Sequence, residues 1–293
     1  MVHGQNQILF PVQHYDLAAT LTSGQAFRWK LRDGLWQGVV GENWVRLRSS
    51  DQGISAETAA PVWDWSWLAD YLQIGVDLEG VLLSFPDDEP MRAAVGACHG
   101  LRLLRQEPWE CLASFILSST KQIVQIQQIV SLLCRRFGAP LLVPPGHEPV
   151  HSFPSAARIA AASETELRAC KMGFRAPNLR AAARVVAEGA IDLKSLGARS
   201  LPEARRELLN LPGVGDKIAN CVLLFAYGFQ EAFPVDVWVM KAMRQLYFPK
   251  RRPSPRRLLQ FTSTHFGPNA GYAQQYLFHY MRQAAGHVRG IHS

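Results

Sequence analysis

A chain of 293 residues with 48% apolar side chains is long enough for one large domain or two of ordinary size, and we predict two, at 1–106 and 107–293. The formal net charge of +7 is unevenly spread, because residues 1–110 hold 8 Lys/Arg against 14 Asp/Glu, while residues 111–293 hold 23 against 10. We therefore expect the C-terminal two-thirds to face a polyanion. The N-terminus lacks a charged segment leading into an apolar one, and no stretch of about eighteen uncharged apolar residues occurs, so we expect neither a secretory signal nor a membrane span.

The five cysteines, at positions 98, 111, 134, 170 and 221, form an odd set without a close pair. No short spacing among them matches a zinc or iron-sulfur site. We expect free thiols in a reducing, intracellular setting, which is the cytoplasm or nucleoid, or the nucleus in a eukaryote.

The first part of the chain is typical of antiparallel strands and hairpins. From residue 8 to about 55, short apolar and aromatic-rich pieces alternate with Gly34, Gly38 and Gly41. From Trp67 to Phe85 the apolar positions instead recur every three or four residues, which predicts helix.

Beyond a turn at 86–90, Gly and Pro separate a series of segments with helical periodicity, and a proline-rich connector spans 138–155. The pattern predicts an α+β protein, in which a small antiparallel sheet precedes a mostly helical body. The expected helices cover 91–103, 108–119, 122–137, 154–162, 164–171, 176–188, 202–210, 216–227, 236–246, 254–265 and 270–284.

The stretch LLNLPGVGDKIANCVLLFAYG, residues 208–228, predicts two helices joined by a sharp turn. Gly213 and Gly215 flank Val214 and let the backbone turn without side-chain clash. The second helix then presents unpaired N–H groups outward, where a phosphate oxygen can accept them. The stretch is compatible with a sequence-nonspecific grip on DNA, although ordinary helix-helix turns also use glycine.

Lys217 is unusual because it falls in the first turn of that second helix, where the helix dipole disfavours a cation. One interpretation is a solvated lysine, or one that pairs with a phosphate. The other is that the dipole and desolvation lower its pKa and supply a neutral, nucleophilic amine near neutral pH.

Asp236 lies in FPVDVWVMKAMRQLY, between the β-favouring Val235 and an amphipathic helix. Asp is among the commonest N-cap residues, so capping alone accounts for it. An ionised carboxylate near a glycosidic bond would additionally stabilise the oxocarbenium-like sugar that forms as a base departs.

LPGVGDKIANC followed by PVDV resembles the helix-hairpin-helix-GPD superfamily of DNA glycosylases. Four more blocks resemble, in order, those of the 8-oxoguanine DNA glycosylases, so the resemblance covers nearly the whole chain. It implies a small sheet domain similar to half of a TATA-binding protein, followed by a helical body. The four blocks are SGQAFRW at 23–29, EPWECLASFILSS at 107–119, MGFRA at 172–176 and FGPNAGYAQQYLF at 266–278.

The resemblance implies that Lys217 forms a Schiff base with the deoxyribose and that Asp236 is the catalytic carboxylate. Gly24 matches the glycine whose carbonyl accepts a hydrogen from N7 of the oxidised base, which undamaged guanine lacks. Cys221 and Phe278 match the pair that sandwiches the extruded base. Gln274 matches the amide that reads its Watson–Crick edge.

Further positions are implied to contact the DNA around the lesion. Phe174 matches a wedge beside the flipped base, and Arg175 matches an arginine that reads the opposite cytosine or contacts a phosphate. The chain departs from the eukaryotic pattern in having Thr120 for an asparagine and Gln125 for a second arginine. Trp238 stands where a histidine commonly faces a phosphate. We expect looser discrimination of the opposite base, because a neutral amide replaces a charged fork.

The resemblance therefore implies an enzyme that excises 8-oxoguanine from duplex DNA in base excision repair, with an associated AP lyase activity. It requires no metal or organic cofactor, and we expect it to act as a monomer away from membranes. The alternatives are an alkylpurine DNA glycosylase of the same superfamily, disfavoured by Lys217, and a non-catalytic DNA-binding protein that kept the hairpin. A DNA-binding protein without catalysis would need only the hairpin's contact with the phosphates.

Overall fold

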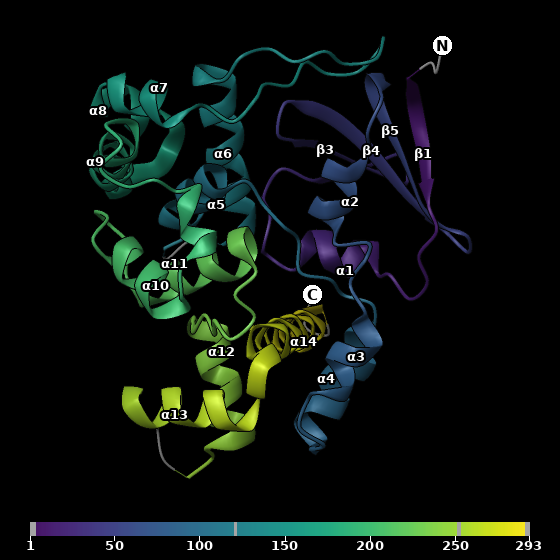
Figure 1. Cartoon of the computed structure of the whole chain (residues 1–293), viewed down its shortest axis with the longest axis vertical. Coiled ribbons are helices and arrows are strands. Elements are labelled where there is room, and N and C mark those ends of the chain that lie inside the picture. Colours follow the sequence, from purple (N-terminus) through teal and green to yellow (C-terminus); the bar gives the residue numbers. More distant parts are fainter. Residues whose placement is uncertain (1–3, 120–121, 251–252, 291–293) are drawn as a thin grey trace.

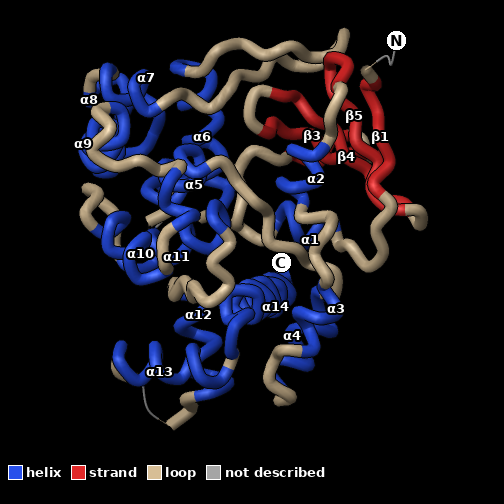
Figure 2. Tube along the Cα trace, in the orientation of Figure 1, coloured by secondary structure: helices blue, strands red, loops and turns tan. Residues whose placement is uncertain are grey.

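The structure is a computed structural model that describes residues 4–119, 122–250 and 253–290, and it divides into a sheet and a larger helical body (Figure 1). The strands lie together at the upper right of the view, with short helices beside and below them, and the larger group of helices lies to the left and below (Figure 2). This arrangement confirms the expected α+β fold class. Among the described residues, no helix is long and apolar enough to cross a membrane.

The sheet is antiparallel throughout, with its strands in the order β1-β5-β4-β3-β2. The hairpin between β2 and β3 is closed by Asp33 and Gly34, both in the left-handed region, at φ 51° and 74°. Val45 and Leu47 of the central strand are fully buried on the core side. The strands are β1 (Gln5–Phe10), β2 (Lys30–Arg32), β3 (Leu35–Val40), β4 (Asn43–Ser50) and β5 (Gly53–Val62).

Two elements of this region differ from the sequence prediction. Helix α1 (Leu17–Thr22) lies within the stretch predicted as strands, and β5 continues well past residue 55. The helix has only six residues, too few for a visible period, and Asp16 caps it by accepting from the Ala19 N–H. Strand β5 contains the segment Ala-Ala-Pro, whose low β-propensity gives no strand signal in the sequence. Pairing with both neighbouring strands, β1 and β4, stabilises β5 instead.

The helical pattern from Trp67 resolves into separate short helices, α2 (Ser66–Leu72) and α3 (Leu78–Leu83), rather than one. Gln73 ends α2 in the left-handed region, and Asp77 caps α3 through a bond from the Gly80 N–H. Helix α4 (Glu89–Cys98) also ends earlier than expected, because the chain turns at Gly100 with φ 95°.

The helical body follows the expected order, and most bounds agree to within two residues. The helices predicted at 216–227 and 236–246 end instead in wide helical turns at Leu223–Tyr227 and Met243–Tyr247, and the last helix continues to Gly290. A wide, kinked turn at Arg168–Met172 replaces the end of the helix predicted at 164–171. The connector 138–155 has no helix, and one isolated bridge joins Pro140 to His151. The helices are α5 (Pro108–Leu117), α6 (Ile123–Phe137), α7 (Ala156–Ala161), α8 (Glu164–Leu167), α9 (Ala176–Ala187), α10 (Leu201–Leu209), α11 (Asp216–Val222), α12 (Val237–Ala242), α13 (Pro255–His265) and α14 (Ala270–Gly290).

Two apolar cores meet along the extended segment 101–107. One lies under the sheet and includes residues of α1 and α2, and the other joins α3 and α4 to the helical body. The neighbours Leu103 and Leu104 belong to different cores. The two-domain division at residue 106 stays a prediction.

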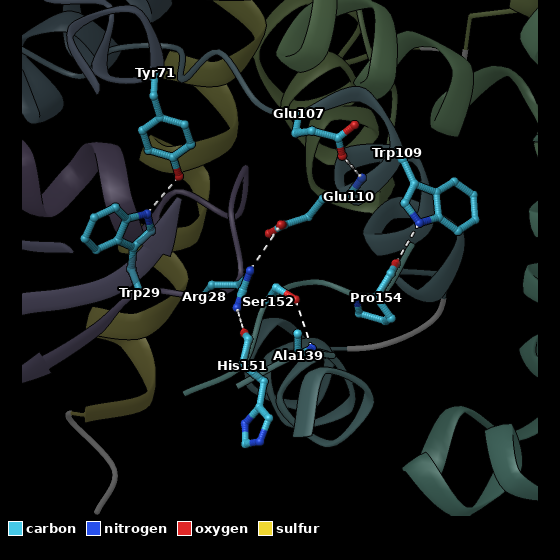
Figure 3. Close-up of polar contacts among 10 residues, drawn as sticks. All are labelled: Arg28, Trp29, Tyr71, Glu107, Trp109, Glu110, Ala139, His151, Ser152 and Pro154. Atoms are coloured by element: carbon cyan, nitrogen blue, oxygen red, sulfur yellow. Dashed lines mark hydrogen bonds and ion pairs between the residues drawn. The ribbon is translucent and has the colours of Figure 1, made fainter. Parts of the chain in front are cut away.

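Polar contacts fasten the 23–29 segment to α5 and to the connector (Figure 3). The Arg28 guanidinium pairs with the Glu110 carboxylate at 3.2 Å and also donates to the His151 carbonyl. Burial raises the pKa of Glu110, and Arg28 opposes that rise. Trp29 donates to the Tyr71 hydroxyl at 2.8 Å. These bonds fix the segment that carries Gly24 against the helix that leads to Ser118.

Candidate active site

The predicted hairpin joins α10 to α11, as expected from the two glycines. Gly213 has φ 78°, and a Cβ there would lie 2.7 Å from the Asn178 Cβ, so this turn requires glycine. Gly215 is the N-cap of α11, and nothing lies within 4 Å of a Cβ built on it. Val214 between them is buried, at 8% exposure. The open space at Gly215 leaves the backbone of the turn accessible, and its contact with a phosphate stays a prediction.

A cavity of about 320 Å³ opens beside the hairpin. The loop after α1, the end of α5, the start of α12, and helices α11 and α14 all contribute to its walls. Larger cavities lie along the sheet, but they contain neither Lys217 nor Asp236. This cavity brings together all six predicted catalytic and base-binding residues, with four others. Its lining is Gly24, Phe115, Lys217, Cys221, Phe225, Pro234, Asp236, Gln274, Gln275 and Phe278.

Lys217 lies in the first turn of α11, as predicted, and its amine points to the end of α5. Its Nζ donates to the Ser118 Oγ at 2.8 Å, and that hydroxyl in turn donates to the Phe115 carbonyl at 2.8 Å. Nζ also lies 5.1 Å from the centroid of the Phe115 ring. In the described part of the chain, Lys217 forms no ion pair with a carboxylate. The amine is therefore oriented by a neutral hydroxyl and an aromatic face.

Asp236 is the N-cap of α12, which confirms the capping prediction. Its Oδ1 accepts from the N–H groups of Trp238 and Val239 at 2.9 and 2.8 Å. Burial raises the pKa of Asp236 above its usual value, while these two bonds and the nearby Lys217 and Arg282 oppose that rise. Among the described residues no hydrogen bond to the second oxygen is formed, and the side chain lines the cavity.

The base-binding candidates give the cavity apolar walls and one unsatisfied polar atom. Burial raises the pKa of the Cys221 thiol to about 11, so this side chain is neutral and polarizable. Gln274 is 3% exposed, and its Oε1 is buried without a hydrogen-bond partner among the described residues. A buried amide oxygen left unpaired costs free energy, which a donor on a bound molecule would recover.

The predicted DNA contacts outside the cavity have mixed surroundings. Phe174 is 64% exposed, whereas Arg175 is 2% exposed with its guanidinium 4.3 Å from the Phe174 ring centroid. Arg175 would therefore need to move to reach a base. The Oε1 of Gln125 accepts from the Gln122 N–H at 3.1 Å in a capping box of α6. Trp238 is half-buried, and Thr120 lies outside the described residues.

Several residues at the site were missed by the sequence analysis. Ser118 and Phe115 orient Lys217, although both stand in the block EPWECLASFILSS. Gln275 lines the cavity next to Gln274, and Arg282 lies on the same helix one turn beyond Phe278. Their spacing of 275, 278 and 282 places them on one face of a helix, which was the available signal.

If Lys217 attacks the sugar as the resemblance implies, replacing Ser118 by alanine is expected to slow single-turnover base excision about tenfold, because an amine that loses its orienting partner samples unproductive rotamers. The alanine variant should still form the covalent adduct with the sugar, since Lys217 remains. Rapid-quench measurement of base release checks this. Ser119→Ala is the matched control, and an unchanged rate in Ser118→Ala would show that the hydroxyl does not orient the amine.

The fold and the cavity define a class of protein, a helix-hairpin-helix enzyme with a lysine and an aspartate beside one small cavity. The chain belongs to the HhH-GPD superfamily of base excision DNA repair proteins, because the model of that family matches residues 113–266. Residues 7–112 match the N-terminal domain of 8-oxoguanine DNA glycosylase.

Three relatives at 28–31% identity cover most of the chain and are named as OGG1-type or 8-oxoguanine glycosylases. The N-glycosylase/DNA lyase OGG1 of Arabidopsis thaliana is 31% identical over 92% of this chain and 79% of its own. The structure of MBOgg1 in complex with a low-affinity DNA ligand has a TM-score of 0.90 and 30% identity, covering 97% of this chain and all of that one. The Clostridium acetobutylicum 8-oxoguanine glycosylase/lyase with DNA containing cytosine opposite 8-oxoG has a TM-score of 0.86 and 28% identity, covering 92% and 93%.

Proposed function

We propose that this chain is a bifunctional DNA glycosylase that everts 8-oxoguanine from duplex DNA, excises it and then nicks the strand. The observation that carries the proposal is the cavity in which Lys217, Asp236 and Gly24 meet. Family membership and relatives named N-glycosylase/DNA lyase support the same activity. The partner is double-stranded DNA, and the basic C-terminal two-thirds of the chain suits its phosphates.

The first chemical step is attack by the Lys217 amine on C1′ of the everted nucleotide. The N–C bond forms as the glycosidic bond breaks, and the electron pair leaves with the purine, which takes up a proton. Positive charge develops on the sugar during this exchange, and the Asp236 carboxylate stabilises it. The carboxylate is held at the cavity wall because its Oδ1 accepts from two backbone N–H groups.

The second step is β-elimination. Loss of the amine proton and opening of the sugar ring give a Schiff base between Lys217 and C1′. The iminium withdraws electrons, so a proton leaves C2′ and the 3′ phosphate departs with its bonding pair. Water then hydrolyses the Schiff base and frees Lys217.

Recognition of the lesion follows from the hydrogen-bonding pattern of the oxidised base. The Gly24 carbonyl accepts the N7 hydrogen that 8-oxoguanine has and guanine lacks, so guanine would set two acceptors against each other. The unpaired Oε1 of Gln274 accepts from the N–H groups of the Watson–Crick edge. Cys221 and Phe278 provide the polarizable and aromatic surfaces between which a purine stacks.

The alternative activities explain the cavity less well. An alkylpurine glycosylase that uses water and an aspartate has no need of the Lys217 amine, and a DNA-binding protein without catalysis has no need of the buried, unpaired Gln274 oxygen. The chemistry proposed here uses side chains alone. We further propose that the enzyme acts as a monomer in the compartment that holds the genome, which sedimentation and fractionation would test.

The test of the function is borohydride trapping on duplex DNA that carries 8-oxoguanine opposite cytosine. Borohydride reduces the Schiff base to a stable amine, so the full-length protein should become covalently linked to the labelled strand. Free 8-oxoguanine should appear in the same reaction without borohydride. A duplex with guanine at the same position is the control, and failure to release the oxidised base would refute the proposed function.

Discrimination of the opposite base should be weak, because the neutral Gln125 replaces a charged fork at the position implied to read cytosine. We expect excision opposite T, G or A to fall within about tenfold of excision opposite C, and Gln125→Arg to widen the preference for C by about tenfold or more, the value of one good base contact. Single-turnover rates on the four duplexes measure this. The matched control is Gln128→Arg, which adds the same charge to an exposed position of α6. A strict requirement for C in the unaltered enzyme would contradict the prediction.

A further inference from the structure

The Gly24 turn, which we define as residues 22–25, is held by hydrogen bonds from helix α14. The Gln275 Nε2 donates to the Ser23 carbonyl at 2.9 Å, and the Arg282 Nη1 donates to the Thr22 carbonyl at 3.3 Å. Gln275 is 2% exposed, so water competes little for its bond. The peptide planes that lead into Gly24 are therefore fixed by a helix from the far end of the chain.

The other side of the turn is fixed through Gln25. Its Nε2 donates to the carbonyls of Thr20 and Arg102 at 2.9 and 2.8 Å, and its Oε1 accepts from the Leu104 N–H at 2.8 Å. The Gln25 carbonyl accepts from the Gln106 Nε2 at 2.7 Å. The peptide plane that leaves the turn is thus fixed as well.

Gly24 itself is confined, and no donor among the described residues reaches its carbonyl. Its φ is 78°, and a Cβ there would lie 2.7 Å from the Ile123 Cδ1 and 3.4 Å from the Phe278 Cε1. In the described parts of the chain, the carbonyls of Thr22, Ser23 and Gln25 accept side-chain hydrogen bonds, whereas none reaches the Gly24 carbonyl. Within the described residues, the Gly24 carbonyl is therefore an unused acceptor between peptide groups that are held in place.

The same face of α14 carries Gln275 and Arg282, which hold the Gly24 turn, and Phe278, which forms a wall of the base cavity. Gln275, Phe278 and Arg282 are spaced by three and four residues, so their side chains project in one direction. The Arg282 guanidinium lies 5.4 Å from the Phe278 ring centroid. A change at Gln275 or Arg282 would therefore move the Gly24 carbonyl relative to the Phe278 ring, on which the base stacks.

We propose that Gln275 and Arg282 are positioning residues that hold the Gly24 carbonyl at the place where it meets N7 of the everted purine, and thereby set the selectivity for oxidised guanine. This inference rests on the proposed function. A hydrogen bond weakens steeply when its length or angle departs from the optimum, and the repulsion that rejects guanine weakens with it. Loosening the turn should reduce selectivity more than it reduces chemistry on the sugar.

The test replaces Gln275 by methionine, which keeps the volume and removes the donor. We expect about a tenfold smaller ratio of binding constants for 8-oxoguanine duplex over guanine duplex, measured in a Lys217→Gln background to prevent turnover. With Lys217 intact, excision of 8-oxoguanine should slow by a similar factor, whereas cleavage of a preformed abasic site should stay within about twofold, since that step has no base to recognise. The control is Gln260→Met, at an exposed position of α13.

Parallel loss of excision and of abasic-site cleavage would mean that Gln275 only supports the scaffold, and this would overturn the inference. Unchanged selectivity in the folded variant would overturn it too. If Gln275→Met does not fold, Arg282→Leu tests the same turn from a half-buried position through the ratio of binding constants in the Lys217→Gln background. We expect about a threefold smaller ratio, because the Arg282 hydrogen bond is longer and weaker. Lack of activity in the unaltered enzyme would instead refute the proposed function, so the two failures are distinguishable.

Discussion

Replacing Lys217 by glutamine is expected to abolish borohydride trapping and to lower the rate of 8-oxoguanine release by about 10⁴-fold or more, the usual scale for losing a nucleophile. Glutamine keeps a polar group that can donate hydrogen bonds but cannot form a Schiff base. Its amide nitrogen is not nucleophilic, because its lone pair is delocalised into the carbonyl. Gel analysis of the reduced adduct and rapid-quench measurement of base release check the prediction.

Binding separates lost chemistry from lost structure in this variant. Affinity for the 8-oxoguanine duplex should change less than about threefold, since base recognition rests on other groups. Lys194→Gln, at an exposed position distant from the cavity residues in sequence, should trap at the rate of the unaltered enzyme. An adduct formed by Lys217→Gln would assign the nucleophile to another amine.

Replacing Asp236 by asparagine is expected to slow base excision by about 10²- to 10³-fold, the range for removing a preorganised electrostatic partner of the transition state. Asparagine can still accept from the Trp238 and Val239 N–H groups, so α12 keeps its cap. The loss therefore reports charge rather than folding. Single-turnover rates measure it, and Asp192→Asn is the control on an exposed carboxylate.

The same carboxylate gives the reaction a dependence on pH. Burial raises the pKa of Asp236, and the ionised form is the one that stabilises the sugar cation. Excision should therefore decline as the pH falls through this raised pKa, and the acidic limb should vanish in Asp236→Asn. A limb that persists unchanged in the asparagine variant would assign it to another group.

Folding stability should depend on pH in the opposite direction from the rate of excision. A carboxyl group whose folded pKa is raised contributes stability that is fully present below its unfolded pKa and is lost as the pH rises through the folded pKa. At neutral pH the ionised Asp236 is thus a cost to the free enzyme, opposed by Lys217 and Arg282. The Tm of Asp236→Asn without DNA should equal or exceed that of the unaltered enzyme near pH 7, which calorimetry can check.

The predictions that failed are those for which the chain carries a weak local signal. Helix α1 was missed because six residues give no period, and β5 because its ladder partners, rather than its Ala-Ala-Pro segment, make it a strand. The helix predicted at 91–103 ends at Cys98, because the chain turns at Gly100 and continues as the extended segment 101–107 between the two cores. Such competition between local preference and packing is invisible along the sequence.

The sequence by itself predicted the fold class, the hairpin glycines, Lys217 and Asp236, because each stands in a local pattern with its own chemical reason. Gly24 and Gln274 were implied by the resemblance alone, and the roles of all four site residues stay predictions. Only the tertiary structure decided that Ser118 orients the lysine and that Gln275 holds the Gly24 turn. Those partners are 99 and 252 residues apart in the sequence. Hydrogen bonds over such separations depend on how complete elements pack, and no local pattern encodes them.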